Sequence, residues 1–421
     1  MTTAPRDGLS ARDMAVILEV TRGLATPFDL LAMLAEVTAA ARQVLHAARA
    51  SVWLHDAAAA ELVLKVASDI SDVRVPVGMG LVGACARDLQ IINVPDCYAD
   101  PRFDPAVDKR SGFHTRCSLT LPLVDHQQAL VGVLQVLNRV GGVFDAADET
   151  LAAALAAQCA VALQRVQMTE ALIETEKMRA ELEMARVVQM STLPATMPVL
   201  AGYEAFGTFQ PAELTGGDTF DLSLVDGQLL VVLGDATGHG IAPALSVTQM
   251  HAMLRMAFRL GADLEAAFAE VNDQLADTLP DDRFITAFIG LLDPATHRMR
   301  FVSAGQGPIL HYQAASGGFA RYPPTSFPLG AMHLPARRAA STLELLPGDV
   351  LLLLSDGIYE QHDASGAMFG EERVEQMVRE FGSASMAALA ARLLAAVPAF
   401  ASGTAQEDDI TLVLLKREAL A

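Results

Sequence analysis

The chain is short of cysteine, tryptophan and positive charge. Its 421 residues include 4 cysteines, 1 tryptophan and 5% aromatic residues, and 30 Lys and Arg stand against 50 Asp and Glu. The formal net charge of −20 disfavours a nucleic-acid partner, because such a surface gathers Lys and Arg against phosphates. None of the cysteines is paired at C-x-x-C spacing, which argues against a zinc site. We expect reduced, mostly buried thiols at Cys85, Cys97, Cys117 and Cys159.

Long hydrophobic runs are also missing. The mean hydropathy is +0.32, but much of it comes from alanine. The longest apolar stretch, 151–163, contains Gln158 and is too short to span a bilayer. The first residues, MTTAPRDGLSARD, have no apolar core of the kind found in signal peptides. These features predict a cytoplasmic protein with no membrane span.

The length predicts two or three domains, and three segments differ in pattern. The first, 12–148, mixes helical and strand periods and predicts an α+β domain. Its helical spacing falls at 14–20 and 30–45, and its strands at 50–56, 61–67 and 119–139. The last, 195–418, consists of short apolar strands with grouped helices, which predicts a sandwich of antiparallel sheets covered by helices. Its strands fall at 229–235, 284–293, 299–305, 350–357 and 410–416, and its helices at 242–260 and 386–397.

Between them, 146–192 predicts one continuous helix, because no glycine or proline interrupts it. Two interpretations stay open: a dimer-forming signalling helix, or a single helix packed on its neighbours. Glu170 and Lys177 occupy core-type positions, so a tight coiled coil is not assured. The apolar stripe consists of Leu163, Val166, Ile173, Ala180, Met184 and Val187.

The stretch 216–240, GGDTFDLSLVDGQLLVVLGDATGHG, predicts a hairpin. Asp226–Gly227 is a strong two-residue turn between alternating strands. If Val225 pairs with Gln228, Asp218 faces Asp235, with Cβ atoms roughly 4.5–5.5 Å apart. Two ionised carboxylates at that distance repel each other. The usual remedies are a shared proton, a basic partner or a bound cation. No Lys or Arg lies between the two acids in the sequence, which favours a hard divalent cation such as Mg²⁺ or Mn²⁺.

Further acids stand at strand ends in the same segment. Asp356–Gly357 follows a buried strand, and Asp408–Asp409 precedes another. Each has a simpler interpretation, as a turn or as a solvated strand start. Gly238 and Gly240 can serve a tight turn, and His239 a structural role. The accumulation of acids in one domain favours a common site at one edge of a sandwich.

Seven motifs follow in order: GGDTFD, LGDATGHG, FITAFIGLLD, SAGQGP, LSDGIYE, FGEER and DDITLVL. Over residues 180–417 this set resembles the bacterial RsbU-type and SpoIIE-type serine phosphatases, a branch of the protein phosphatase 2C (PPM) superfamily. The resemblance implies two antiparallel sheets flanked by helices, with two Mn²⁺ or Mg²⁺ ions between them. It also implies a substrate, a phosphorylated anti-anti-sigma-like protein of a partner-switching pathway.

The resemblance assigns a role to each acidic position. Asp235 would bridge the two metals, and the backbone carbonyl of Ala236 would bind one of them. Asp218 would bind metal directly or hold metal-bound waters. Asp218 and Asp235 are therefore the catalytic candidates. The other ion would be bound by Asp356 and by the pair Asp408 and Asp409, of which Asp408 matches better.

Such a centre implies metal-assisted hydrolysis of phosphoserine or phosphothreonine, which needs no catalytic Cys or Ser. One position departs from the family: Gln306 stands where a histidine is usual. The alternative function is therefore a non-catalytic sensor whose phosphatase-like domain binds a partner. A cyclic-nucleotide phosphodiesterase is disfavoured, because the chain has no histidine-rich metal motif.

The N-terminal part resembles a GAF domain, a small-molecule sensor, over residues 12–165. The resemblance is carried by VPVGMGLVGACARDLQIINVPDCYADPRFD and ALVGVLQVLNR. Within it, NRVGGVFDAADE resembles the signature of cyclic-nucleotide-binding GAF domains. The matching residues are Asn138, Phe144, Asp148 and Glu149, with Arg139 in place of Lys. They can bind a nucleotide, or tie the last strand to the following helix as a scaffold. We expect a homodimer through this domain and the 146–192 helix.

Overall fold

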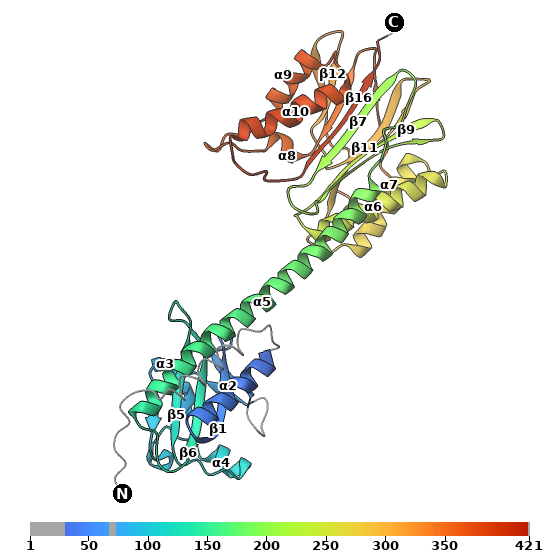
Figure 1. The fold of residues 1–421 in the computed structure, drawn as a ribbon. Helices are drawn as coiled ribbons and strands as arrows, with labels where there is room; N and C mark the ends of the chain where they lie inside the picture. Colours follow the sequence, from blue (N-terminus) through green and yellow to red (C-terminus); the bar gives the residue numbers. More distant parts are fainter. Residues whose placement is uncertain (1–29, 67–72, 420–421) are drawn as a thin grey trace. The chain divides into compact units, whose positions relative to one another are not determined.

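The computed structural model describes residues 30–66 and 73–419. These form two compact units, one up to Glu176 and one from Lys177 onward, and each is described by itself. The helix α5, Ala146–Thr192, begins in the first unit and ends in the second (Figure 1). Its bounds agree with the predicted 146–192. The helix expected at 14–20 and the expected domain start at residue 12 lie outside the described residues.

The N-terminal unit is built on a six-stranded antiparallel sheet of order β3-β2-β1-β6-β5-β4. One core, which includes Leu34, Leu134 and Leu155, joins this sheet to α2 and to the first part of α5. A second core, which includes Leu62 and Leu81, involves α3. The strands are β1 Ala47–Asp56, β2 Glu61–Val66, β3 Arg74–Pro76, β4 Ile92–Val94, β5 Ser118–Val124 and β6 Leu130–Arg139. The helices are α2 Leu30–Val44, α3 Gly80–Asp88, the 3-10 turn η1 Cys97–Ala99 and α4 Ala106–Ser111.

All four cysteines are buried free thiols, as the sequence predicts. Burial raises the pKa of Cys85, Cys97 and Cys159 to about 12. Because the thiolate is the reactive form, these side chains act as small apolar groups of the core.

The C-terminal unit contains two five-stranded antiparallel sheets. The first, of order β14-β11-β10-β9-β8, consists of β8 Asp218–Val225, β9 Gln228–Ala236, β10 Ile285–Asp293, β11 Arg298–Ala304 and β14 Ser341–Glu344. The second, of order β13-β12-β15-β16-β7, consists of β7 Tyr203–Gln210, β12 Ile309–Gln313, β13 Gly318–Tyr322, β15 Val350–Leu354 and β16 Ile410–Arg417. The helices are α6 Ile241–Arg259, α7 Leu264–Thr278, α8 Asp356–Tyr359, α9 Glu371–Phe381 and α10 Met386–Ala401.

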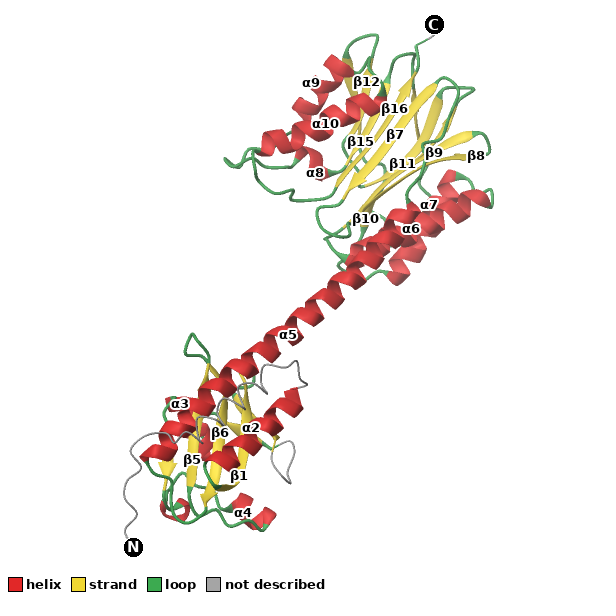
Figure 2. Cartoon of the chain, in the orientation of Figure 1, coloured by secondary structure: helices red, strands yellow, loops and turns green. Residues whose placement is uncertain are grey.

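Alternation along the strands arranges these elements in four layers (Figure 2). In β9, Leu229 and Leu233 belong to a core shared by both sheets, whereas Leu230 faces a core with α6 and α7. In the second sheet, Leu352 faces a core with α9 and α10. Each sheet thus buries one face on the other sheet and one on helices, and the predicted helix-covered sandwich is confirmed.

The apolar stripe of α5 is divided between burial and exposure. Leu163 is fully buried in the N-terminal core. Ile173, Met184 and Val187 are 63%, 63% and 68% exposed, so no described part of the chain covers them. By length and composition alone α5 could cross a membrane, and half of its apolar window is buried inside the structure.

Candidate metal centre

The hairpin predicted from the sequence forms in the predicted register. Strands β8 and β9 turn at Asp226–Gly227, Val225 pairs with Gln228, and Asp218 lies directly opposite Asp235. Both carboxylates share the inner face with Leu233, because residues two apart in a strand lie on one face. They therefore lie where the inter-sheet core ends.

The second sheet brings its own polar residues to this end of the core. Alternation places Thr411 on the inner face of β16, in line with Val413. The Thr411 hydroxyl donates to Oδ2 of Asp218 at 2.6 Å. The Ser355 hydroxyl, which follows β15, donates to the Asp409 carbonyl at 3.0 Å and accepts from the Thr411 amide at 2.8 Å. The two sheets are thus tied together beneath Asp218.

These carboxyl groups carry raised pKa values. Burial, and then the charge of Asp235, raises the pKa of Asp218 well above its usual range. Burial, followed by the charges of Asp356, Asp408 and Asp409, raises the pKa of Asp235 to about 7. Burial also raises the pKa of Asp356 and of Asp409. The acids thus act on one another as like charges with too little solvent to screen them.

No positive group compensates these five acids within the described residues. None of them forms an ion pair with Lys, Arg or His there. Within the same residues, no group of three or more His, Cys, Asp or Glu side chains is placed so that it could hold a metal ion. The site therefore consists of oxygen donors and unbalanced negative charge.

The two neighbouring acids Asp408 and Asp409 differ in environment. Asp409 is 6% exposed, and its oxygens accept from the amides of Ala212 at 2.8 Å and Asp218 at 3.3 Å. Asp408 is exposed, and among the residues that the structure describes its Oδ1 accepts only from the Asp409 amide, at 2.8 Å. Asp409 thus holds the loop before β8, and Asp408 keeps free oxygens at the surface of the site.

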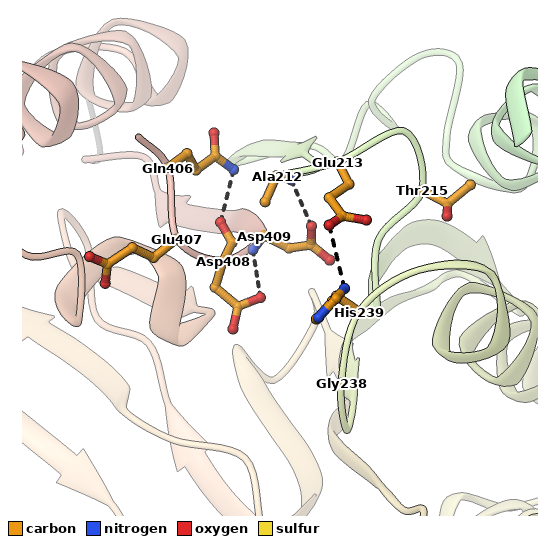
Figure 3. Close-up of a pocket in the computed structure, with 9 residues that line it drawn as sticks. All are labelled: Ala212, Glu213, Thr215, Gly238, His239, Gln406, Glu407, Asp408 and Asp409. Carbon is orange, nitrogen blue, oxygen red and sulfur yellow. Dashed lines mark hydrogen bonds and ion pairs between the residues drawn. The ribbon is translucent and has the colours of Figure 1, made fainter. Parts of the chain in front are cut away.

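A pocket of about 220 Å³ opens beside this pair (Figure 3). Its lining consists of Ala212, Glu213, Thr215, Gly238, His239, Gln406, Glu407, Asp408 and Asp409. The side chain of His239 is 80% exposed, with Nδ1 at 3.5 Å from Oε1 of Glu213. His239 therefore lies at the rim of the pocket.

Three glycines keep the backbone close to the acids. A Cβ on Gly217 would stand 2.7 Å from the carbonyl oxygen of Ala236. A Cβ on Gly216 would overlap the carboxylate of Asp409, and one on Gly357 would overlap the Asp409 backbone carbonyl. Carboxylate and carbonyl oxygens of this kind suit Mn²⁺ and Mg²⁺, and the raised pKa values show the charge that a cation would neutralise. The residues present therefore fit the implied ions in donor type and charge.

Gln306, which departs from the family pattern, is buried and fully paired. Its Oε1 accepts from the Thr286 hydroxyl at 2.9 Å, and its Nε2 donates to the Leu354 carbonyl at 3.1 Å. Thr286 lies opposite Asp235 in the β9–β10 ladder, and Leu354 ends the strand before Asp356. Gln306 therefore joins the strands that carry these two acids.

The signature residues of the N-terminal unit are all engaged internally. Arg139 Nε donates to Asp148 Oδ2 at 2.5 Å, and Glu149 accepts from Asn93 Nδ2 at 2.7 Å. Phe144 is 4% exposed in the core. These contacts fasten the end of β6 and strand β4 to the start of α5.

Asn138 makes a similar set of contacts with the segment before β5. Its Oδ1 accepts from the amides of Arg116 and Cys117 at 2.6 and 3.3 Å. Its Nδ2 donates to the His114 carbonyl at 2.7 Å. The geometry thus favours the scaffold interpretation of the signature.

Sequence reasoning missed several residues that support the acids, among them Thr411 and Ser355. Thr411 could have been found, because it stands two residues after Asp409 and shares its face in an extended strand. Ser355 is adjacent to Asp356, and only the packing of the two sheets reveals its bonds.

Comparisons with known proteins agree with the division of the chain into an N-terminal and a C-terminal unit. Residues 225–418 match the family model "Stage II sporulation protein E (SpoIIE)", and residues 29–163 match the GAF domain model. The SpoIIE match contains Asp235, Asp356, Asp408 and Asp409, and Asp218 lies just before it. The chain therefore carries a domain that matches the SpoIIE family, preceded by a GAF domain.

The individual solved structures that resemble this chain have low sequence identity to it. The SiaA-PP2C domain of Pseudomonas aeruginosa is similar with a TM-score of 0.51 and 21% identity, over 58% of this chain and 98% of that chain. This likeness shows the fold. The RsbU and RsbW domains of a Mycobacterium tuberculosis protein align with 25% identity and a TM-score of 0.46, over 55% of this chain and 64% of that chain.

A curated relative matches over a short segment. The dual 3',5'-cyclic-AMP and -GMP phosphodiesterase 11 of Drosophila melanogaster is 31% identical over 119 residues, which are 28% of this chain. This chain therefore spans only 8% of the length of that enzyme.

Proposed function

We propose that the protein is a metal-dependent protein serine/threonine phosphatase regulated by its GAF domain. Its parts are a GAF sensor at 12–148, a helical linker at 146–192 and a phosphatase domain at 195–418. The observation that carries the proposal is the opposed, buried pair Asp218 and Asp235, which lacks any basic partner in the described chain. When both carboxyls are ionised, such a pair is costly unless a cation binds to it.

In this proposal each acid has a distinct role. Asp235 would bridge two Mn²⁺ or Mg²⁺ ions, and the Ala236 carbonyl and Asp218 would complete one side. Asp356 and Asp408 would hold the other side, and Asp409 would keep the loop before β8 in place. When bound, the two ions would supply a nucleophilic hydroxide and neutralise charge on the phosphoryl group.

The chain's own residues would prepare the site for these ions. Thr411 donates to Asp218, which favours the ionised carboxylate that a metal requires. The inter-sheet core closes the inner side of the site, so a phosphorylated segment would approach from the pocket beside Asp408 and His239. The proposed substrate is a phosphorylated anti-anti-sigma-like protein in a cytoplasmic partner-switching pathway.

The regulatory part of the proposal rests on α5. Its exposed stripe, which includes Ile173, Met184 and Val187, would be covered by a second copy of the chain in a homodimer. Because a ligand shifts only an equilibrium between states that it binds differently, the helix would be the element with two positions. A cross-linked or disrupted linker that left activity unchanged would count against this part.

The deciding experiment is phosphate release from an aryl phosphate during a Mn²⁺ titration. We expect turnover that requires metal and falls at least about a thousandfold in Asp235→Asn. Asp226→Asn is the matched control, because Asp226 lies exposed at the turn of the same hairpin and asparagine tolerates its positive φ. A native protein that hydrolyses neither the aryl phosphate nor a phosphorylated partner would favour the non-catalytic binding protein instead.

The GAF ligand is tested separately. A cyclic nucleotide remains the candidate ligand for the signature residues Asn138, Arg139, Phe144, Asp148 and Glu149. Binding would raise the melting temperature of the native protein by mass action. No shift at millimolar cyclic AMP or cyclic GMP would leave these residues with the scaffold role that their contacts favour.

A further inference from the structure

The last turns of α5 contact the loop that carries Asp218. Gln189 is only 3% exposed, and its side-chain amide pairs with both backbone polar groups of one residue, Gly216. Its Nε2 donates to the Gly216 carbonyl at 2.6 Å, and its Oε1 accepts from the Gly216 amide at 3.2 Å. A longer bond, 3.4 Å, runs from Nε2 to the carbonyl of Asp218 itself.

This loop has few other means of holding its shape. Gly216 and Gly217 have no side chains with which to anchor it. On the other side, Asp409 accepts from the Asp218 amide at 3.3 Å, and the Gly217 carbonyl accepts from the Ala236 amide at 3.0 Å. The backbone before Asp218 is therefore held between the Gln189 amide and the acid-bearing strands.

A second contact joins the same helix to the same loop. Arg186, three residues before Gln189, donates from Nη1 to the Leu214 carbonyl at 3.1 Å. Residues three apart lie on one face of a helix, so both side chains extend from the face that meets the loop. The neighbouring Val188 is 57% exposed and takes no part.

We propose that Gln189 is a positioning residue that couples the location of α5 to the orientation of Asp218, and thereby to metal affinity. This inference rests on the proposed function of the acidic site. A hydrogen bond tolerates only a few tenths of an ångström of displacement, so a small shift or rotation of α5 would release the backbone of Gly216. The helix begins in the GAF unit, and the chain itself therefore provides the connection.

The test is Gln189→Met in the full chain, because methionine keeps the length of the side chain and removes both hydrogen-bonding ends. Mn²⁺ binding is measured by calorimetry without substrate, alongside the Mn²⁺ dependence of hydrolysis. We expect Mn²⁺ binding to weaken about tenfold, as is usual when a residue that orients a ligand is lost. Turnover at saturating Mn²⁺ should stay within about threefold of native, since the ligands remain.

Val188→Ala is the matched control and should bind Mn²⁺ as the native chain does. Arg186→Met should weaken binding in the same direction by a smaller factor, and it decides the question if Gln189→Met does not fold. A lower melting temperature with unchanged Mn²⁺ affinity, in whichever of the two variants folds, would reduce the contact to a structural one and overturn the inference. Because binding is read without substrate, a chain that binds Mn²⁺ but hydrolyses nothing would refute the proposed phosphatase and still test Gln189.

Discussion

The two units differ in whether their buried acidic side chains have partners that compensate the negative charge. At the junction of β6 and α5, Asp148 accepts a hydrogen bond from Arg139, and Glu149 accepts one from Asn93. At the end of the inter-sheet core, Asp218 and Asp235 face each other, and no basic group of the described residues pairs with either. A compensated carboxylate contributes to structure, whereas an uncompensated buried one marks a place where something else must bind.

The contrast recurs within the single strand β8. Asp221, three residues after Asp218, lies on the opposite face, toward α6. Burial alone would raise the pKa of Asp221, but the His251 ring, whose Nε2 lies 3.3 Å from Oδ2, and the hydrogen bonds from Arg255 outweigh burial and hold the pKa below its usual range. Arg255 forms a fork of two bonds of 2.7 Å to this carboxylate. Burial therefore does not by itself distinguish a structural acid from a candidate ligand; the partners do.

The largest effect is expected where the backbone must lie against the acids. In Gly357→Ala the new Cβ would overlap the carbonyl of Asp409, and backbone cannot move aside as a flexible side chain can. We expect a loss of stability of about 4 kcal/mol or more, together with loss of hydrolysis. Gly318→Ala is the control, because its Cβ would meet only the Ser316 hydroxyl, at 3.3 Å. Equal melting temperatures for the two variants would contradict the close approach.

The second effect is the pH dependence of the stability of the metal-free protein. The folded pKa of Asp235 is about 7 and the reference value is 3.8. A carboxyl whose pKa is raised on folding stabilises the fold below about pH 4, and this contribution is lost as pH rises through 7. At about 1.4 kcal/mol per unit, the loss reaches up to about 4 kcal/mol.

Asp235→Asn should remove this dependence. The metal-free variant is expected to be more stable than native at pH 8 and similar to it at pH 4, with Mn²⁺ stabilising only the native chain at pH 8. Chemical denaturation at both pH values measures the difference, and Asp226→Asn should follow the native protein. A native stability that does not fall between pH 4 and pH 8 would show that the charge of Asp235 is balanced after all.

A third test removes the basic partner of the structural acid Asp221. Arg255→Met leaves Asp221 buried without its fork, and we expect a loss of about 2–4 kcal/mol. The Mn²⁺ affinity should change little, because Asp221 faces α6 rather than the acids. Arg298→Met, which removes an exposed pair with Glu344, is the control and should cost less than about 1 kcal/mol. A large change in Mn²⁺ affinity in Arg255→Met would mean that the two faces of β8 are not independent.

The smallest effect is expected in the GAF unit. Arg139→Met breaks a half-buried ion pair with Asp148 and should cost about 1–2 kcal/mol in denaturation experiments. Hydrolysis at saturating Mn²⁺ should be unchanged. Arg87→Met, which removes an exposed pair with Asp88, is the matched control. A loss of cyclic-nucleotide binding in Arg139→Met, with stability retained, would assign the pair to a ligand instead.

The sequence predicts the local parts of this arrangement well. The turn Asp226–Gly227 and the two-residue period of its strands set the register that opposes Asp218 and Asp235. Helix α5 follows from a run without glycine or proline. These inferences needed only neighbouring residues and one repeat length.

Contacts between distant segments escaped prediction. Thr411 reaches Asp218 across the gap between two sheets, and Gln189 reaches Gly216 from the end of a helix. The separate roles of Asp408 and Asp409 depend on which carboxylate meets the backbone amides of the loop before β8. A single sequence records none of these pairings, because each depends on how complete layers pack.

The glycines beside the acids give a criterion for reading related sequences. A relative can keep every carboxylate and still carry a side chain at the position of Gly216 or Gly357, where the new atom would occupy the space of Asp409. Such a chain would keep the acidic residues in its sequence, but its two sheets could no longer approach each other at this edge. We therefore expect that the presence of these glycines distinguishes active from inactive members of the family better than the presence of the aspartates does.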